Sequence, residues 1–475
     1  MKSLTDPSQA LSTGLTKIRT EFHVPNGFPA VVMAAAEVAA KRVPSQHTDR
    51  TAMPFVTLDP ASSTDLDQAF SIEASGGDLL LHYAIADVAW FVEDGDAIDL
   101  EAWTRGETLY LPDGKAGLYP PALAEGAASL LPDGPRPAVV FTVRVAEDGL
   151  VKLDGAERAI IQSRAKLAYD SVQASDLPAG FAEMARRMAM NEKRRGASRV
   201  DPPEQEVERL ADGTFRLSFR PLLQSEQDNA ALSLAANMAI ADAMLAHHTG
   251  LFRVMSEPDA SKVQRLRNAA LALGLSWPAS TSLHDYQRTL DPADPQQAAL
   301  MLEIRHASPG ASYQPYQEGV VPWHEAMAAT YAHATAPLRR LADRYVVRCV
   351  LAIANGQPAP QAVTDAFTRL PKVMGRAGAR ASQINHAAID LAEAVMLRGR
   401  EGETFKAVVT DVNHGVRVQL ADMPIVANLN AAGVRQGDGL TLRLVLADPD
   451  QRRIVFDLPE RRTLPPPVQS PASAG

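Results

Sequence analysis

The stretch FVTLDPASSTDLDQAF, residues 55–70, places three aspartates on a short turn that follows a run of β-branched and aromatic residues. Asp59 ends that run, and Asp65 and Asp67 lie in the turn. Several carboxylates on one tight loop repel each other, which is costly unless a cation lies between them. All-oxygen ligands favour Mg²⁺ or Mn²⁺, and such ions commonly bind substrate phosphates. The stretch therefore predicts a strand that leads into a cation site for phosphodiester chemistry.

A second interpretation of the same turn needs no metal. Asp, Ser, Thr and Pro are ordinary turn residues, and Ser63 or Asp65 could cap the start of a helix. The spacing does not fit an EF-hand, which needs a glycine at its sixth position and a distal glutamate. Taken alone, the turn leaves both interpretations open.

The patterns around this turn predict an α+β fold. Between about residues 53 and 160, β-branched and aromatic runs are bounded by Gly, Asp and Pro, which is typical of strands. After about residue 160 helical periodicity dominates, which indicates a mixed α/β domain over residues 51–398. Five short strands with turn residues between them predict a C-terminal five-stranded OB β-barrel over residues 400–459.

The two ends of the chain have their own patterns. Residues 1–50 contain two helical stretches, 11–22 and 30–42, separated by VPNGFP. This small helical N-terminal segment is either a helix-turn-helix or a simple helical lead-in. Residues 460–475 are rich in Pro, Ser and Ala and predict a disordered tail.

Composition narrows the class of protein. The 475 residues include 56 acidic and 47 basic side chains, for a formal charge of −9, which argues only weakly against a locally basic channel for nucleic acid. The single cysteine, Cys349, lies in an apolar run and fits a reducing, cytoplasmic compartment. No stretch approaches the roughly 18 apolar residues of a membrane helix, and the polar start contains no apolar signal core.

A second candidate site lies in APLRRLADRYVVR, residues 336–348. Arg339 and Arg340 flank the start of a predicted helix, and Arg344 follows one turn later. Guanidinium groups and free helix N–H groups both match phosphate oxygens. The alternative is a solvated helix face in which Asp343 pairs with an arginine. The chain contains no P-loop and no dinucleotide fingerprint, so we expect no nucleotide cofactor.

Three motifs in order, TLDPASSTDLDQAF, HYAIADVAWFVEDGDAIDLEAWTRGETLYLPDG and YAHATAPLRRLADRYV, resemble the exoribonuclease II/R family over roughly residues 28–458. The resemblance implies a monomeric, processive hydrolase that uses Mg²⁺, with Mn²⁺ as a substitute. It implies degradation of single-stranded RNA from a free 3′ end to nucleoside 5′-monophosphates. It also implies that the terminal barrel is the family's RNA-binding OB domain.

The same resemblance implies roles for individual residues. Asp59, Asp65 and Asp67 fall on the family's catalytic, metal-binding acidic motif. Arg339 falls on the arginine that stabilises charge at the scissile phosphate, and Tyr110 falls on the aromatic that packs against the last nucleotides. Arg340 and Arg344 are further candidates for RNA contacts.

The chain departs from the family at several positions. The acidic motif usually ends in two aspartates, but Gln68 follows Asp67 here, so this ligand position has a carbonyl oxygen and no charge. Val200 stands where the family often has a second stacking aromatic, and Ala336 and Leu341 replace a serine and a tyrosine. The family's two N-terminal OB domains do not fit into about 50 residues, so we expect weaker RNA affinity and altered tolerance of duplexes.

Gln68 keeps an alternative open, namely a noncatalytic RNA-binding relative. The retention of Asp59, Asp65, Asp67 and Arg339 together favours an active exoribonuclease over that alternative. A transcription factor built on the N-terminal helices would leave most of the chain without a role.

Overall fold

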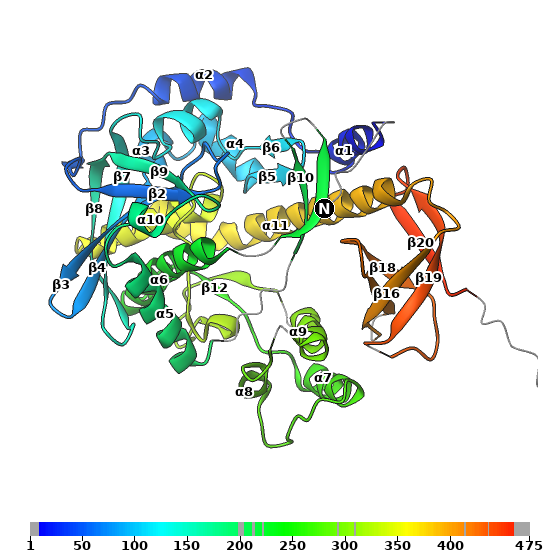
Figure 1. The fold of residues 1–475 in the computed structure, drawn as a ribbon. Helices are drawn as coiled ribbons and strands as arrows, with labels where there is room; N and C mark the ends of the chain where they lie inside the picture. Colours follow the sequence, from blue (N-terminus) through cyan, green and yellow to red (C-terminus); the bar gives the residue numbers. More distant parts are fainter. Residues whose placement is uncertain are drawn as a thin grey trace, which may run out of the picture.

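The structure is a computed structural model that describes residues 9–197, 204–210, 214–220, 223–291, 294–307, 310–412, 415–435 and 437–459. Figure 1 shows a body built around one curved sheet, a C-terminal barrel beside it, and the long helix α11 (Gln361–Leu397) running from one to the other. The predicted α+β class is confirmed. Val200 and the tail 460–475 lie outside the described residues.

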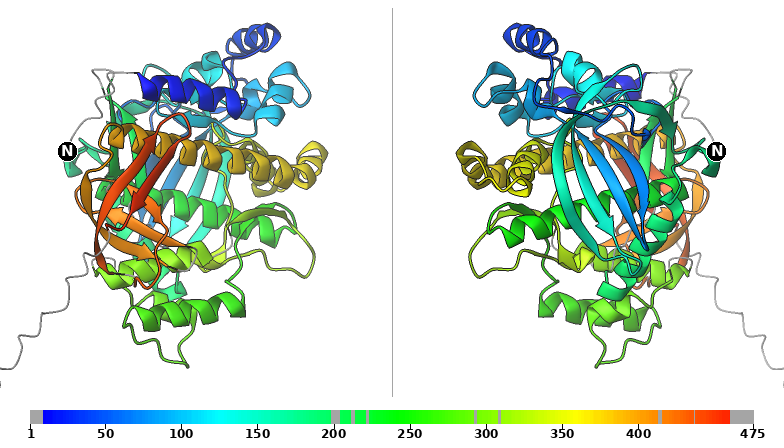
Figure 2. Two further views of the ribbon diagram at one scale, coloured as in Figure 1. Left: turned by 90° about the vertical axis from the view of Figure 1, so that its right-hand side faces the viewer. Right: turned by 90° about the vertical axis from the view of Figure 1, so that its left-hand side faces the viewer.

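The central sheet has seven strands in the order β1-β8-β7-β4-β3-β2-β9. Strands β8 and β9 are separated only by Gln162 although they lie near opposite edges, so the sheet curls strongly, as Figure 2 shows. The edge pairs β1–β8 and β2–β9 are parallel, and the other neighbouring pairs of strands are antiparallel. The strand bounds are β1 Thr48–Asp49, β2 Phe55–Asp59, β3 Gln68–Ser75, β4 Asp78–Ala86, β7 Arg136–Val145, β8 Val151–Ile161 and β9 Ser163–Ala168.

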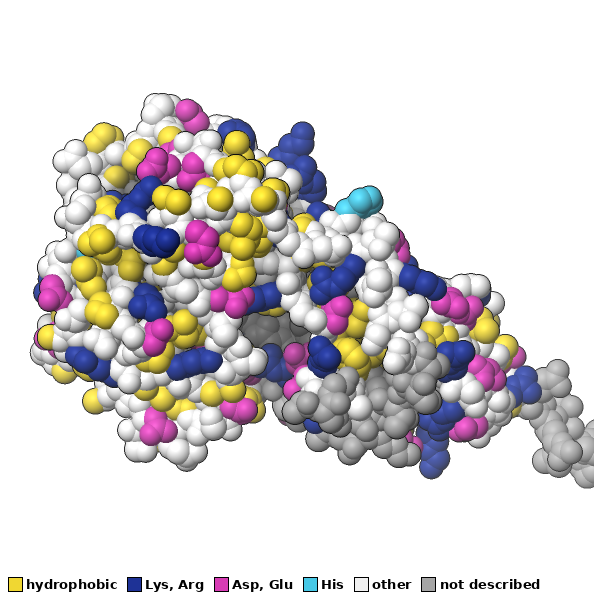
Figure 3. All heavy atoms as spheres, turned by 90° about the horizontal axis from the view of Figure 1, so that it is seen from above, with side chains coloured by type: hydrophobic (Ala, Val, Ile, Leu, Met, Phe, Trp, Pro, Cys, Tyr) yellow, Lys and Arg dark blue, Asp and Glu magenta, His cyan; other side chains and the backbone are white. Residues whose placement is uncertain are grey.

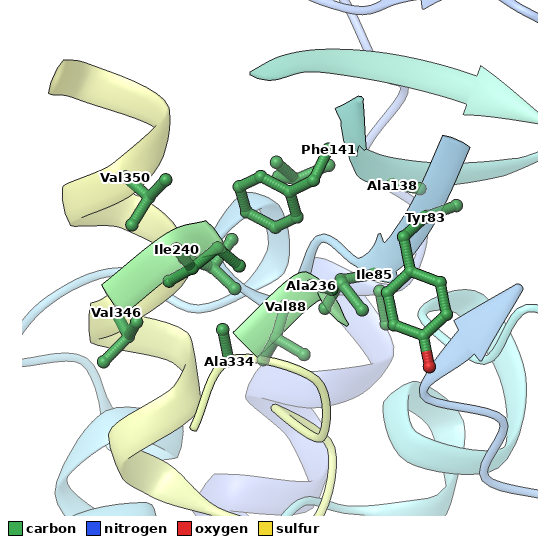
Figure 4. Packing of buried hydrophobic residues seen from close by; sticks show 14 of the residues in the cluster. Tyr83, Ile85, Val88, Ala138, Phe141, Ala236, Ile240, Ala334, Val346 and Val350 are labelled. Carbon is green, nitrogen blue, oxygen red and sulfur yellow. The ribbon is translucent and has the colours of Figure 1, made fainter. Parts of the chain in front are cut away.

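Two helices, α6 (Gln224–Ala246) and α10 (Leu341–Ala354), pack on this sheet and close the main hydrophobic core. Figure 4 shows side chains of both helices meeting those of the strands, with the Tyr83 hydroxyl at the margin of the cluster. Among the described residues α6 is the one helix long and apolar enough to cross a membrane, so the expectation that no stretch approaches that length was wrong. Two-thirds of its apolar window is buried inside the protein. Cys349, the free cysteine of α10, is buried.

Shorter elements complete the body, and α7, α8 and α9 have a small core of their own. Their bounds are α3 Val88–Phe91, α4 Ala97–Arg105, β5 Leu109–Leu111, β6 Gly114–Ala116, the π-helical turn η1 Leu123–Ala127, η2 Ala174–Asp176, α5 Phe181–Arg195, β10 Glu204–Arg209, β11 Phe215–Arg220, β12 Leu251–Val254, α7 Ala260–Ala272, α8 Leu283–Gln287, α9 Pro295–Ala307, β13 Ser312–Pro315, β14 Trp323–His324, η3 Glu325–Met327 and β15 Ala329–Thr330.

The C-terminal barrel confirms the predicted five-stranded, OB-like domain. It is closed in the order β16-β17-β18-β20-β19, and its two phenylalanines, Phe405 and Phe456, pack edge to face in its core. Neither ring is therefore available to stack on bases at the surface. The strand bounds are β16 Thr404–Asp411, β17 Val416–Leu420, β18 Val426–Leu429, β19 Gly439–Asp448 and β20 Arg453–Asp457.

The two predicted N-terminal helices form, as α1 (Ala10–Glu21) and α2 (Ala30–Ala39), but they belong to different cores. Leu11, Leu15 and Ile18 of α1 pack with α11 and the barrel, whereas α2 packs on α4 and the main core. A helix-turn-helix needs two helices packed against each other, so that interpretation was wrong. The apolar face of α1 therefore joins α11 to the barrel, whereas that of α2 covers part of the main core.

Glu393 of α11 links the helix to the barrel. The Glu393 side chain is 3% exposed, and its Oε1 accepts hydrogen bonds from the Val426 amide at 2.9 Å and from Gln205 Nε2 at 2.7 Å. Burial raises the pKa of this carboxyl to about 7, against the hydrogen bonds, which lower it. The native state therefore binds a proton here that the unfolded chain has already released above about pH 4.5.

We predict that this proton makes stability fall as pH rises from about 4.5 to about 7, after which the effect levels off. Glu393→Gln removes the ionisable group. Between pH 5 and pH 8 the free energy of unfolding of this variant should therefore rise by on the order of 2 kcal/mol relative to that of the native chain, because one pKa unit corresponds to about 1.4 kcal/mol. Urea unfolding of both proteins at the two pH values measures this difference. Glu393→Ala is the control and should be destabilised at both. Equal pH dependence of the native chain and the Glu393→Gln variant would contradict the prediction.

Candidate active site

The acidic turn connects two neighbouring strands of the sheet. Strand β2 ends at Asp59, residues 60–67 have no regular structure, and β3 begins at Gln68. Ser129 anchors the turn, because its hydroxyl accepts from the Leu66 amide at 2.9 Å and donates to the Thr64 carbonyl at 2.7 Å. The helix-cap interpretation of this turn was wrong, since a strand follows it.

Asp67 is the most enclosed of the three carboxylates, at 5% exposed. Its Oδ1 accepts the Leu338 amide at 2.7 Å, and its Oδ2 lies 3.3 Å from Arg339 Nε. Burial raises the pKa of Asp67 to about 7, against the opposing effect of the Arg339 charge. The structure thus brings together Asp67 and Arg339, two residues that the sequence indicated from separate motifs.

The other two aspartates have different surroundings. Asp59 Oδ2 is buried and has no hydrogen-bond partner, and burial raises the pKa of this carboxyl to about 6, with Arg339 opposing the shift. Asp65, by contrast, forms an ion pair with Lys115 Nζ at 2.7 Å. Asp59 therefore has one buried carboxylate oxygen without a hydrogen bond, whereas Asp65 is paired with a lysine.

Gln68 is engaged within the protein. Its Oε1 accepts the Tyr83 hydroxyl at 2.7 Å and lies 3.3 Å from the Ser233 hydroxyl. Burial raises the pKa of Tyr83 above its ordinary value, so the phenol stays a donor. The predicted role of Gln68 as a metal ligand would require this carbonyl oxygen to leave two hydroxyl groups.

The chemistry of these donors fits a divalent cation. Over the described part of the chain, no three or more His, Cys, Asp or Glu side chains gather closely enough to hold a metal ion. Mg²⁺, however, is usually bound through one or two carboxylates together with waters and substrate phosphates. Asp59 and Asp67 supply two carboxylates whose pKa values are raised by burial. They fit such a cation better than Asp65 and Gln68 do.

The three arginines of the second motif have three different surroundings. Arg339 is 47% exposed and lies beside Asp67. Arg340 pairs with Asp343 at 2.7 Å, as the alternative interpretation expected. Asp343 also accepts a hydrogen bond from the Ala336 amide. Arg344 is 1% exposed and pairs with Asp99 of α4.

The prediction that Arg344 contacts RNA was wrong, because its guanidinium is enclosed in the protein and bonds there to Asp99 and Tyr345. The role of Arg340 in RNA contacts stays a prediction, with its charge already matched by Asp343. Arg339 is the member of the trio that points to the site.

The segment that carries Tyr110 is held against the arginine loop. The Thr108 amide donates to the Arg339 carbonyl at 2.9 Å, and the Leu341 amide donates to the Gly106 carbonyl at 3.0 Å. Gly106 has φ +77, and a Cβ there would lie 2.8 Å from the Ala377 Cβ, so this crossing needs glycine. Tyr110 follows on β5 with its ring 56% exposed.

The sequence analysis did not indicate two residues that contact the acidic turn, Lys115 and Tyr83. Lys115 lies opposite Tyr110 in the β5–β6 hairpin, which the turn residues PDG between alternating residues could have indicated. Tyr83 lies in the expected strand HYAIA, but nothing in its pattern indicates a contact with Gln68. On the face in Figure 3, Lys and Arg are interspersed with Asp and Glu, so charge does not mark the site on that face.

The unequal burial of the arginines generates a prediction. Arg344→Met should lower the free energy of unfolding by about 3–5 kcal/mol, because it leaves the Asp99 charge buried without its partner. Arg348→Met is the matched control and should cost less than about 1 kcal/mol, since its partner Asp94 is exposed and keeps its hydration. Denaturant unfolding of both variants measures the difference. Equal destabilisation by the two changes would contradict the assignment of Arg344 to the core.

Comparisons with known proteins agree with this geometry. A model of the RNB domain matches residues 47–356, and a model of the RNase II-type exonuclease C-terminal S1 domain matches residues 403–458. Ribonuclease R of Aquifex aeolicus is 25% identical over 496 aligned residues, which cover 93% of this chain and 69% of that protein. Across three such ribonuclease R relatives, the chain spans 60 to 69% of the relative's length.

Solved structures show the same fold. The RNase R of Mycoplasma genitalium in complex with ribose-methylated single-stranded RNA superimposes with a TM-score of 0.83 at 19% identity, covering 96% of this chain and 79% of that one. Yeast Ssd1, described as a pseudonuclease, superimposes with a TM-score of 0.68 at 16% identity, covering 90% of this chain and 56% of that one. The RNB model takes in well over half of the sequence. The chain therefore belongs to the RNB-domain family and carries an RNase II-type C-terminal S1 domain.

Proposed function

We propose that this chain is a 3′→5′ exoribonuclease that hydrolyses single-stranded RNA from a free 3′ end and releases nucleoside 5′-monophosphates. One observation carries the proposal. The buried Asp67 carboxylate contacts the Leu338 amide and the half-exposed Arg339 guanidinium, and Asp59, whose buried Oδ2 has no hydrogen-bond partner, ends the strand before the same turn. Two carboxylates and a free arginine are the groups that metal-assisted phosphodiester hydrolysis needs.

In this proposal Asp59 and Asp67 hold Mg²⁺, or Mn²⁺ in its place. When bound, the cation supplies a Lewis acid for the phosphodiester and lowers the pKa of a water. Arg339 neutralises the negative charge that develops on the phosphoryl oxygens, because about half of its side chain remains exposed beside Asp67. The bond from phosphorus to the 3′ oxygen breaks, the water oxygen stays on the released 5′-phosphate, and a proton goes to the new 3′-hydroxyl.

In this proposal Tyr110 and the barrel bind the RNA substrate. The exposed Tyr110 ring offers a base-stacking surface that accepts any base. The S1 domain match supports RNA binding by the barrel, although the contacts do not involve the buried Phe405 and Phe456. Processive action by a monomer in the cytoplasm completes the proposal.

The alternative is a noncatalytic RNA-binding relative, and Gln68 is its strongest argument. The likeness to a pseudonuclease means that the fold alone does not decide activity. The retained contact of Asp67 with Arg339 favours catalysis, because a binding protein would not need a buried carboxylate paired with a half-exposed arginine.

The first experiment is a gel time course on 5′-labelled single-stranded RNA with Mg²⁺ and then Mn²⁺. We expect long RNA to pass directly to one short end product, with loss of at least about 100-fold in rate for Asp67→Asn and Arg339→Met. Arg348→Met is the matched control, since Arg348 pairs with the exposed Asp94 away from this site. No degradation in either metal, with RNA binding intact, would favour the noncatalytic alternative, and Gln68→Asp would then be tested for a gain of activity.

A second prediction concerns Tyr110. Tyr110→Ala should weaken binding of single-stranded RNA by about 1–3 kcal/mol, because one stacked base loses its partner. Tyr110→Phe keeps the ring and should bind within about twofold of the native chain, since the hydroxyl adds little to stacking. Fluorescence anisotropy with catalytically inactive Asp67→Asn as the background measures both. Equal weakening by Ala and Phe would remove Tyr110 as a stacking residue.

A further inference from the structure

The two polar atoms of the Gln68 amide have different surroundings, and one of them is held inside the protein. Its Oε1 accepts the Tyr83 hydroxyl at 2.7 Å and lies 3.3 Å from the Ser233 hydroxyl. Those two hydroxyls are themselves 2.6 Å apart, and Tyr83 is fully buried. Because a neutral phenol donates and a carbonyl oxygen only accepts, this contact fixes which end of the amide faces inward.

The other end of the amide, Nε2, is free. Of the residues that the structure describes, none accepts a hydrogen bond from Gln68 Nε2. The side chain is half-buried, and its nitrogen is open to solvent. An amide nitrogen carries two N–H donors. Gln68 therefore presents hydrogen-bond donors without a charge at the position where the family usually has a carboxylate.

These donors lie at the candidate active site. Gln68 directly follows Asp67 and begins β3, and the pairing of β3 with β4 fixes its place in the sheet. Its partner Tyr83 is close to the site as well. Burial raises the pKa of Tyr83, and the nearby charges of Asp59 and Arg339 shift it further in opposite directions. The Gln68 amide therefore belongs to the same region as the carboxylates and the half-exposed guanidinium.

The free end of this amide suits a phosphodiester better than a cation. An ionised carboxylate only accepts hydrogen bonds, whereas an amide N–H donates to a phosphate oxygen. The carbonyl oxygen is the end of the amide that binds cations, and here two hydroxyls already contact it. Hydrogen bonds from neutral side chains to phosphate oxygens position a nucleic acid without reading its sequence. A neutral donor next to Asp67 therefore favours contact with the RNA backbone.

We infer that Gln68 Nε2 donates a hydrogen bond to a phosphate oxygen of the bound RNA, and that Tyr83 and Ser233 hold the amide in the orientation that this contact needs. The inference rests on the proposed function, because it takes RNA as the substrate. Gln68 is then a binding residue, and Tyr83 and Ser233 are positioning residues that act through it. The position that the sequence suggested as a metal ligand serves the substrate instead.

The test is fluorescence anisotropy of labelled single-stranded RNA with the full chain in EDTA, which removes divalent cations. Gln68→Met keeps the length of the side chain and removes the donor, so RNA affinity should fall at least about fivefold, because a hydrogen bond to a charged group is lost. Gln68→Glu, which also adds a negative charge, should bind more weakly still. Gln361→Met is the matched control and should stay within about twofold of the native chain, since the Gln361 amide contacts Asp365 at the exposed start of α11.

Two further measurements separate the parts of the inference. RNA with 2′-deoxyribose in its 3′-terminal nucleotides keeps the phosphates and loses the hydroxyls, so Gln68→Met should weaken its binding by the same factor. Tyr83→Phe should weaken RNA binding by about threefold, because the amide is then free to turn. In a Gln68→Met background the same change should add nothing. A purely structural role of Tyr83 would give the same loss in both backgrounds.

Binding by Gln68→Met within about twofold of the native chain would overturn the inference. A metal-ligand role predicts that result, since EDTA leaves no metal to lose. A loss that disappears on the 2′-deoxy RNA, or additive losses for Tyr83 and Gln68, would overturn it too. Circular dichroism checks folding, and if Tyr83→Phe is unfolded the Gln68 variants still decide.

The binding assay involves no cleavage, so its failure is distinct from a failure to degrade RNA in the gel time course. Degradation of RNA together with native-like binding by Gln68→Met would keep the proposed function and remove this inference. A native chain that binds no RNA would overturn both.

Discussion

The site depends on the contact between the Asp67 carboxylate and the Leu338 amide, two groups 271 residues apart in the chain. A buried carboxylate is strongly unfavourable unless it accepts hydrogen bonds or lies next to positive charge. Asp67 has both, from one short segment, because Leu338 and Arg339 are neighbours. The sheet and α10 must therefore meet in one arrangement, which keeps the acidic turn against the arginine loop.

The arginine loop shows how burial assigns different roles to identical side chains. Asp343 accepts from the Ala336 amide and from Arg340, which makes the loop rigid. Arg344 fills the contact with α4 through Asp99, and only Arg339 keeps half of its surface open. A single free guanidinium beside a buried carboxylate is more specific for a phosphate than three solvated ones would be.

The ends of the chain and the barrel form a second unit of packing around α11. Helix α1 and the barrel share one hydrophobic cluster with the C-terminal half of α11, and Glu393 ties that helix to β10 and to the amide of Val426. The β5–β6 hairpin belongs to the same cluster. The hairpin that presents Tyr110 and Lys115 thus rests on the unit that also contains the S1 domain.

The sequence by itself determined the α+β class and the five-stranded barrel and indicated Asp59, Asp65, Asp67 and Arg339 as candidate site residues, because strand alternation, turn residues and short motifs are local properties. Only the tertiary structure decided that α1 and α2 pack into different cores, that Arg344 is buried and that Lys115 pairs with Asp65. A charged residue in a helical pattern looks the same whether its partner is water or a buried carboxylate from another element. That partner is set by long-range packing, which no spacing within one segment records.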